Sequence, residues 1–150
     1  MPKIENKWDS LYDPGKQTWF TKLEEKAINW YFSRMFGKTI LSASGVKSGK
    51  IFEPGCGSGM TCVQFAQDGF DITLMDLSPN ALKKALTTFE NFGQSCKFTI
   101  GDLFNLPFPD EEFDVVFNQG VMEHFKIAGI SPDAGIQEML RVVKKGGTLI

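Results

Sequence analysis

"FEPGCGSGM", residues 52–60, places a glycine at every second position behind an acid and a proline. It overlaps the short run 50–53, which is typical of a buried strand. Glycine lets the backbone approach a bound molecule closely and adopt turns that other residues avoid. The stretch therefore predicts a ligand-binding loop. Three kinds of ligand are open at this point: a nucleotide phosphate, the pyrophosphate of a dinucleotide, or a ligand without phosphate.

The elements around this loop predict an α/β fold with a parallel sheet covered on both faces. Strands are expected at 50–53, 70–76, 96–100, 113–118 and from 148, and helices at about 20–30, 59–67, 79–92 and 132–145. Ligands of such sheets bind beyond the carboxyl ends of the strands, where strand order reverses. The unusual residues of this chain lie at those ends: 53–59, Asp76, Asp102 and 118–124.

Two helices carry start and stop signals. Ser78 is expected to cap a helix that has Pro79 at its first position and ends at Gly93. Its buried stripe is expected to hold Ala81, Leu82, Ala85, Leu86 and Phe89. Ser131–Pro132 repeats the cap signature, and Gly146–Gly147 is expected to end that helix. Its apolar face is expected to hold Ile136, Met139, Leu140 and Val143, while the acids 110–112 are expected in a solvated turn.

The glycine spacing separates the three kinds of ligand. "GVKSGKI", residues 45–51, is one residue too short for a phosphate loop and precedes the strand. The dinucleotide fingerprint requires a third glycine where Met60 stands, because the third glycine of this chain is Gly59. Asp76 lies where an acid accepts from the two hydroxyls of a ribose, with helix capping as its alternative role. A nucleoside without pyrophosphate fits this pattern better than a dinucleotide.

Four stretches in this order are similar to the motifs of class I S-adenosylmethionine-dependent methyltransferases with a type 11 domain. They are "FEPGCGSG", "LMDLSPNAL", "GDLFNLPFPDEEFDVVFNQGVMEHF" and "MLRVVKKGGTLI", and "WDSLY" near the start is also often seen there. The resemblance implies a Rossmann-like, doubly wound parallel sheet. The complete family sheet has the order 3-2-1-4-5-7-6, and this chain reaches only the fifth strand, which leaves 3-2-1-4-5.

The resemblance also implies the cofactor S-adenosyl-L-methionine, with S-adenosyl-L-homocysteine as product, and a role for each loop. The backbone at Gly55 and Gly57 would approach methionine and ribose, with the small residue Cys56 between them. Glu53 would contact the loop and the cofactor, and Asp76 would contact the ribose. The adenine would be contacted by Leu77, Asp102 and Leu103. The methionine ammonium would be contacted by Asn118 and Gln119. Asp102 has a plain turn role as its alternative.

Catalysis by such a site rests mainly on positioning, because the sulfonium methyl group is already activated. Glu123 and His124 follow the fourth strand, and His124 is the only histidine. They are the candidate catalytic residues, as general bases toward an acceptor. Their alternative is a pair of helix-start residues with hydrogen-bonding duties.

Composition limits the partners. The formal net charge is -2, which gives no general reason to expect nucleic acid, so the expected acceptor is a small molecule. Cys56, Cys62 and Cys96 are spaced too unevenly for a zinc site, and no metal is expected. An odd number of cysteines without a signal peptide or a membrane-length apolar run favours a cytoplasmic protein.

The predicted organisation is an N-terminal segment and helix over residues 1–40, covering the cofactor side, and a core over 41–150. Trp8, Tyr12 and Trp19 would either form a lid over the cofactor or fix the segment to the domain. The core stops at the fifth strand, so we expect a fragment of a longer protein or self-association through the unpaired sheet edge. A non-catalytic cofactor-binding or interaction module and an NAD-dependent oxidoreductase are the alternatives to an active methyltransferase.

Overall fold

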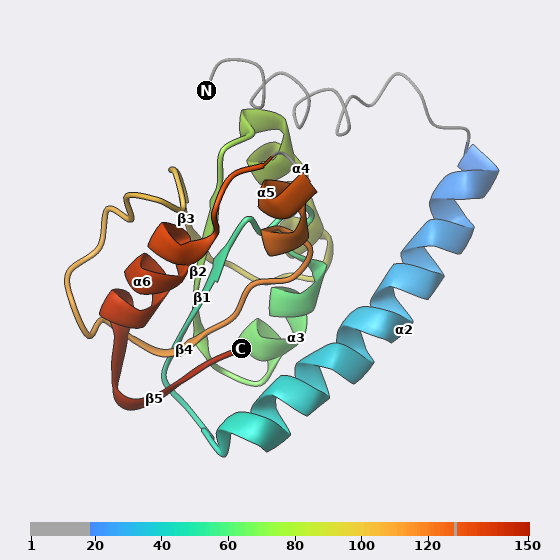
Figure 1. The fold of residues 1–150 in the computed structure, drawn as a ribbon. Coiled ribbons are helices and arrows are strands. Elements are labelled where there is room, and N and C mark those ends of the chain that lie inside the picture. The colour runs from blue at the N-terminus through green and yellow to red at the C-terminus, as the bar shows by residue number, and fades with distance from the viewer. Residues whose placement is uncertain (1–18, 128) are drawn as a thin grey trace.

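The structure, a computed structural model, describes residues 19–127 and 129–150. Its elements are α2 (Trp19–Ser44), β1 (Lys50–Pro54), α3 (Met60–Gln67), β2 (Asp71–Asp76), α4 (Pro79–Asn91), β3 (Lys97–Ile100), β4 (Phe113–Val116), α5 (Met122–Ile127), α6 (Asp133–Val142) and β5 (Val143–Leu149). The strands form one parallel sheet in the order β3-β2-β1-β4-β5 (Figure 1). The α/β fold and the strand order are confirmed, and the sheet of the described residues ends at β5.

The central strand β1 sets the position of the ligand edge. Ile51 aligns with Ile72 of β2 on one side and with Val115 of β4 on the other. The chain leaves β1 toward β2 and β3, then returns to the opposite side with β4 and β5. Strand order therefore reverses between β1 and β4, and a crevice opens beyond their carboxyl ends in folds of this kind.

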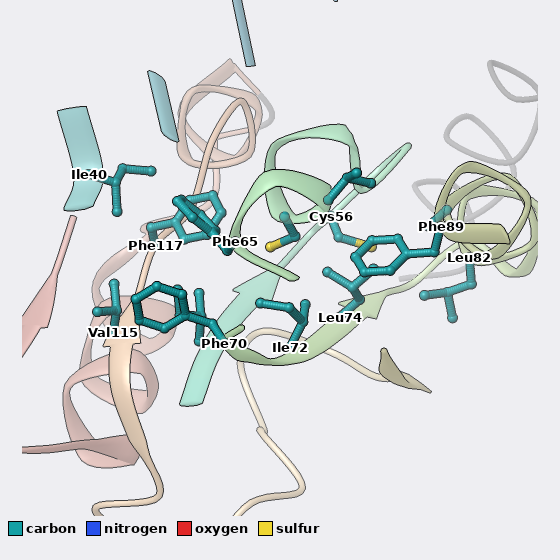
Figure 2. Close-up of a cluster of buried hydrophobic side chains, with 14 residues drawn as sticks. Ile40, Cys56, Phe65, Phe70, Ile72, Leu74, Leu82, Phe89, Val115 and Phe117 are labelled. Carbon is teal, nitrogen blue, oxygen red and sulfur yellow. The ribbon is translucent and has the colours of Figure 1, made fainter. Parts of the chain in front are cut away.

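Two apolar cores cover the two faces of the sheet. The first core packs α2, α3 and α4 on one face, and Figure 2 labels ten of its residues: Ile40, Cys56, Phe65, Phe70, Ile72, Leu74, Leu82, Phe89, Val115 and Phe117. The second core packs α5, α6 and the loop before β4 on the other face, through Phe52, Met75, Leu103, Leu106, Phe113, Val116, Phe125, Met139 and Val142. A strand that is buried on both faces has apolar residues at consecutive positions, which explains why residues 51 and 52 are both apolar.

The start of α4 follows the sequence prediction. The Ser78 hydroxyl accepts from the Ala81 N–H at 3.1 Å, and Pro79 is the first helical residue. Gly93 follows the helix with φ of 64°, a conformation that glycine adopts without strain. The buried stripe differs at one place, because Thr88 is buried where Leu86 was expected. The rest of α4 lies as predicted.

The prediction for α6 and β5 is wrong at both ends of the helix. Pro132 is the N-cap rather than the first helical residue. The Ser131 hydroxyl lies one position before that cap, donates to Asp133 Oδ2 at 2.7 Å and accepts from the Asp133 N–H at 3.3 Å. The helix ends at Val142, and Gly146–Gly147 lie inside β5, where the register with β4 shifts. The buried residues are Gly135, Met139 and Val142, whereas Leu140 is 47% exposed.

The reason for the early helix end is a long-range contact. The carbonyl groups of Arg141 and Val142 accept from the Glu111 and Glu112 N–H groups at 3.0 and 2.9 Å. Those two carbonyls are thus satisfied by the turn before β4, and the chain passes directly into an extended strand. The glycines at 146 and 147 cannot predict this helix end, because it depends on a turn that is distant in the sequence.

The long helix α2 reaches Ser44 and packs against α3. Its last turns contribute Ile40 to the first core. The predicted lid residues Trp8 and Tyr12 and the side chain of Trp19 lie outside the described part of the structure. The assignment of residues 1–40 to the cofactor side stays a prediction.

Replacing Gly59 with alanine is expected to destabilise the protein by about 2–4 kcal/mol. Gly59 has φ of 64°, and an added Cβ would lie 3.0 Å from Leu74 Cδ1 and 3.2 Å from Ala85 Cβ in the first core. Gly69→Ala is the matched control, because Gly69 also has positive φ but an added Cβ meets nothing within 4 Å. In urea unfolding, the free energy of unfolding lost by Gly59→Ala should exceed that lost by Gly69→Ala by at least about 1 kcal/mol. Equal losses would mean that only backbone strain matters at position 59.

Candidate functional site

The carboxyl ends of four neighbouring strands meet at one place and carry the predicted site residues. The loop after β1 touches β2, because the Gly57 N–H donates to Asp76 Oδ2 at 2.9 Å. The end of β3 touches β2, because the Gly101 N–H donates to the Asp76 carbonyl at 3.2 Å. The end of β4 touches β1, because Asn118 Nδ2 donates to the Pro54 carbonyl at 2.6 Å. The structure thus brings the strand-end residues of the prediction together.

The glycine loop bends through three left-handed residues. Gly55, Gly57 and Gly59 have φ of 71°, 52° and 64°. The N–H groups of Gly55 and Cys56 both donate to the Met75 carbonyl, at 2.7 and 3.0 Å, which fixes the loop against β2. A Cβ at Gly55 would collide with the side chain of Val121 in the β4–α5 connection. The alternating glycines are therefore required by backbone conformation and, at Gly55 and Gly59, also by space.

Asp76 holds two neighbouring segments. Its Oδ2 accepts from the Gly57 N–H and its Oδ1 from the Ser78 N–H, each at 2.9 Å. Burial raises the pKa of Asp76, and the N–H groups of Ser78, Gly57 and Leu77 oppose that rise. A carboxylate oxygen has two acceptor positions, so both oxygens retain capacity for a ligand hydroxyl. Ligand binding and loop fixation are compatible roles for this side chain.

Glu53 is a carboxyl group buried at the end of β1, only 4% exposed. Burial is the largest cause that raises its pKa, to about 8; the Cys62 thiol hydrogen bond lowers it and the charge of Asp76 adds to the rise. Its Oε2 has no hydrogen-bond partner in the structure. An unpartnered buried carboxyl oxygen is costly. Such an atom at a strand end indicates a ligand that would complete it.

Asn118 provides a second buried acceptor at the same carboxyl edge of the sheet. Its Nδ2 bonds Pro54, while its Oδ1 is buried without a partner. The next residue, Gln119, is exposed, and its Oε1 accepts from the Thr61 hydroxyl at 3.3 Å. The unpartnered oxygens of Glu53 and Asn118 therefore lie on β1 and just after β4, the two strands between which the order reverses.

The loop after β3 begins with a tight turn at Asp102. Its Oδ1 accepts from the Phe104 N–H at 2.9 Å, and an isolated bridge joins Asp102 to Asn105. The Leu103 side chain is buried in the second core, so only its backbone is available to a ligand. The turn role that the sequence left open for Asp102 is present. The adenine role stays a prediction.

The remaining candidates differ in what the structure says of them. Leu77 is half-buried at the end of β2, whereas the Cys56 side chain is buried in the first core and leaves only backbone for a ligand. His124 is half-buried on α5, which follows β4. The side chain of Glu123 lies outside the described part of the structure. Catalytic roles for Glu123 and His124 stay predictions.

The acids 110–112 lie in a solvated turn, as predicted, because Asp110 and Glu111 are exposed and Glu112 is half-buried, and all three are also ion-paired. Each carboxylate meets a cation from a different element: Glu112 pairs with Lys50, Glu111 with Lys145 and Asp110 with Arg141, at 2.7, 3.0 and 2.9 Å. Folding brings these partners together from distant parts of the sequence. Arg141 also reaches the loop of Asp102, a contact for which the sequence carried no local signal.

The described ranges contain no helix that is both long and apolar enough to cross a lipid bilayer. Within the same ranges, no three His, Cys, Asp or Glu side chains gather as a metal-binding group. Cys56, Cys62 and Cys96 are free thiols, and the first two are buried. Burial raises the pKa of both of these thiols well above its ordinary value.

Comparison with known proteins assigns this arrangement to a family. Residues 52–150 match the family model described as a methyltransferase domain. An uncharacterized methyltransferase of Schizosaccharomyces pombe is 34% identical over 110 residues, which cover 67% of this chain and 38% of that protein. Norajmaline N-methyltransferase of Rauvolfia serpentina is 28% identical over 145 residues, which cover 95% of this chain and 48% of that protein. The chain thus spans half or less of the length of these relatives.

A solved structure shows the same fold. A Methanococcus maripaludis protein assigned to the S-adenosyl-L-methionine-dependent methyltransferases superposes with a TM-score of 0.73 at 20% identity, covering 84% of this chain and 57% of that chain. The family match sets aside the NAD-dependent oxidoreductase. The strand order, the glycine loop and the matched domain agree, and the chain belongs to the S-adenosylmethionine-dependent methyltransferases of the methyltransferase domain family.

Proposed function

We propose that the protein containing this chain transfers a methyl group from S-adenosyl-L-methionine to a small-molecule acceptor, with release of S-adenosyl-L-homocysteine. The observation that carries the proposal is the pair of unpartnered buried oxygens, Glu53 Oε2 and Asn118 Oδ1. They lie at the carboxyl ends of β1 and β4, and each has hydrogen-bonding capacity that no residue of the described structure uses; a bound cation would also favour the charged form of Glu53. The methionine ammonium of the cofactor is a cation with three donors, so these residues fit the group.

The other strand ends would hold the rest of the cofactor. The left-handed backbone at Gly55 and Gly57 leaves no side chain between the loop and a ligand. Asp76 would accept from the ribose hydroxyls while it keeps the Gly57 and Ser78 N–H groups. Leu77 would pack on the adenine, and Asp102 and the Leu103 backbone would meet its edge.

Catalysis in this proposal rests on alignment. S-adenosyl-L-methionine supplies an activated methyl group, and the protein has to hold an acceptor in line with it. His124 would take a proton from an acceptor hydroxyl or amine, because α5 begins beside the carboxyl end of β4. The fixed strand ends keep the cofactor residues in place during this step.

A small acceptor is supported by the charge of the chain and by one relative. Five basic residues are each paired with an acid: Lys50, Lys97, Arg141, Lys144 and Lys145. These five therefore form no unpaired basic stripe that a polyanion could bind. Norajmaline N-methyltransferase is named for a small molecule. We also infer a cytoplasmic location from the free thiols.

Calorimetric titration of the folded chain with S-adenosyl-L-homocysteine tests the cofactor part of the proposal. We expect one site with a dissociation constant in the micromolar range. Absence of heat with protein shown to be folded by circular dichroism would contradict it.

A transfer assay tests the acceptor part. The full-length protein would be incubated with methyl-labelled cofactor and a cell extract separated by size, and label is expected in the low-molecular-weight fraction. Label in the protein or nucleic-acid fraction would overturn the small-molecule acceptor. Binding without any labelled product would indicate a non-catalytic cofactor-binding module.

A further inference from the structure

The loop between β3 and β4 carries the proposed adenine contacts but has little structure of its own. Residues 101–112 contain one isolated bridge, Asp102 to Asn105, and no helix or strand. Backbone groups in such a loop need partners from elsewhere in the fold. What fixes this loop therefore decides where Asp102 and the Leu103 backbone stand.

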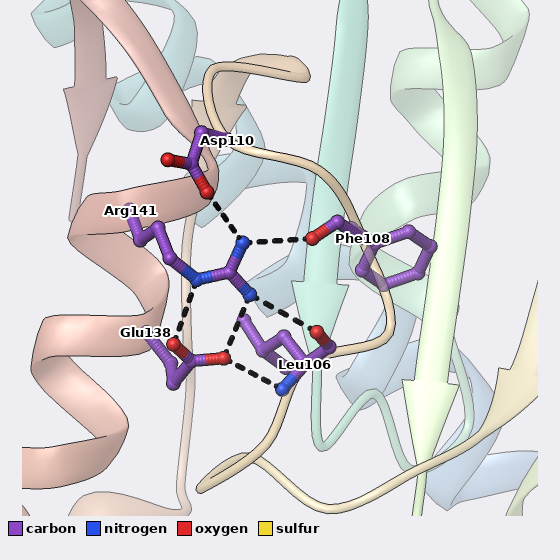
Figure 3. A network of polar contacts seen from close by, with 5 residues as sticks. All are labelled: Leu106, Phe108, Asp110, Glu138 and Arg141. Carbon is purple, nitrogen blue, oxygen red and sulfur yellow. Dashed lines mark hydrogen bonds and ion pairs between the residues drawn. The ribbon is translucent and has the colours of Figure 1, made fainter.

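The guanidinium of Arg141 on α6 supplies those partners (Figure 3). It donates to the Leu106 carbonyl at 3.0 Å and to the Phe108 carbonyl at 2.8 Å. It also donates to Asp110 Oδ1 at 2.9 Å and to both oxygens of Glu138 at 2.7 and 2.8 Å. One planar group thus bonds two backbone carbonyls and two carboxylates.

Glu138 completes the contact from the same helix. Its Oε2 accepts from the Leu106 N–H at 2.8 Å, so that the backbone donor and acceptor of this residue are both held by α6. Arg141 holds the pKa of Glu138 below its ordinary value through their hydrogen bond. The carboxylate stays charged at neutral pH, which keeps both bonds strong.

Helix α6 also approaches the loop directly. A Cβ at Gly135 would lie 3.1 Å from Leu103 Cγ, so the helix backbone packs closely on the residue next to Asp102. On the other side, the ring centroids of Phe104 and Phe125 lie 4.8 Å apart, so the loop also packs against α5. The loop is thus held by contacts with both helices.

We propose that Arg141 and Glu138 are positioning residues for the adenine end of the cofactor site. They act through the backbone of Leu106 and Phe108 and set the place of Asp102 and the Leu103 backbone. This inference rests on the proposed function, because it assigns adenine recognition to that loop. Lysine at position 141 keeps the charge but offers one ammonium, which does not span two carbonyls and two carboxylates.

The test compares S-adenosylhomocysteine with S-inosylhomocysteine, in which an oxygen replaces the amino group of the adenine. Dissociation constants are measured calorimetrically for the wild-type chain, Arg141→Lys and Glu138→Gln. Lys144→Met is the matched control. It removes the 2.8 Å ion pair between Lys144 of β5 and Asp114 of β4, and neither of these residues bonds residues 102–108. Thermal melts confirm that each variant is folded at the titration temperature.

The wild type and Lys144→Met are expected to prefer the adenosyl ligand by about tenfold or more, the discrimination of one hydrogen bond. Arg141→Lys and Glu138→Gln are expected to lose most of this preference. A loss of stability alone would leave the ratio of the two dissociation constants unchanged. Two folded variants with the wild-type preference would overturn the inference. A wild type that binds both ligands equally would also overturn it while the proposed function stands, and a wild type that binds neither would contradict the proposed function itself.

Discussion

Replacing Glu53 with glutamine is expected to remove most of the fall in stability that the wild-type chain shows between about pH 5 and pH 8. The carboxyl group is buried at the end of β1, and burial is the main cause that raises its pKa to about 8. The folded state therefore binds this proton more tightly than the unfolded chain, in which the pKa is near its ordinary value. The stabilisation is complete below the unfolded pKa and is lost as the pH rises through the folded pKa.

The size of the effect follows from the shift. Each unit of pKa difference corresponds to about 1.4 kcal/mol, so Glu53 contributes up to roughly 5 kcal/mol of pH-dependent stability. Glutamine keeps the shape of the side chain and does not titrate. Its chain should be nearly as stable at pH 8 as at pH 5, apart from the smaller contribution of Asp76, whose pKa burial also raises.

Urea unfolding at pH 5, 6.5 and 8 measures this difference. Glu112→Gln is the matched control, because it removes a partly exposed carboxylate paired with Lys50 from the same sheet. We expect the control to keep the wild-type pH dependence. A wild type whose stability does not fall across this range, or a Glu53→Gln variant with the wild-type slope, would show that Glu53 is not held neutral in the folded protein.

The parts of the fold that the sequence predicts well depend on local chemistry. A serine before a proline is enough to cap α4, because the cap bond closes within three residues. Within the predicted strand 50–53, Ile51 and Phe52 are both apolar because β1 is buried on both faces of the sheet. The alternating glycines predict a sharply bent loop, because glycine adopts the positive φ that Gly55, Gly57 and Gly59 have. The strand order came from the family resemblance.

The parts that the sequence predicts poorly depend on distant partners. Gly146–Gly147 resembles a helix end, yet the carbonyls of Arg141 and Val142 are satisfied by the 110–112 turn and the strand starts at once. The ion pairs of the same turn have no signal in its own residues, because the cations come from β1, α6 and β5. No local pattern records these pairings.

The site shows the same division. Residue types at strand ends led to Asp76 and Asn118 as site candidates, and the structure places both at the shared carboxyl edge of the parallel strands, while their roles toward a ligand stay predictions. The orientation of Cys56 into the first core was not predictable, since a residue between two glycines has no periodic neighbours to assign its face. Arg141 was missed because its partners in the β3–β4 loop lie more than thirty positions away in the sequence.

Replacing Asp76 with asparagine is expected to weaken the binding of S-adenosylhomocysteine by at least about 100-fold. Asparagine has one acceptor oxygen, whereas Asp76 accepts the Gly57 and Ser78 N–H groups with two oxygens. One of these N–H groups would face the amide NH₂, which releases the loop or the start of α4. In the proposed function the same change removes the charged acceptor of the ribose hydroxyls, and a hydrogen bond to a charged group is worth about 1.5–3 kcal/mol.

Calorimetric titration of Asp76→Asn, with Asp71→Asn as the matched control, separates these roles. Asp71 begins the strand that Asp76 ends, and its ion pair with Lys97 is exposed, so its loss should leave affinity unchanged. 2′,3′-Dideoxy-S-adenosylhomocysteine, which lacks both ribose hydroxyls, should bind the wild type and Asp76→Asn with more similar affinities than the natural ligand does. An equal loss for both ligands would assign Asp76 to loop fixation alone. Unchanged affinity for the natural ligand would exclude both roles, because the carboxylate would then neither hold the glycine loop in its binding form nor meet the ribose.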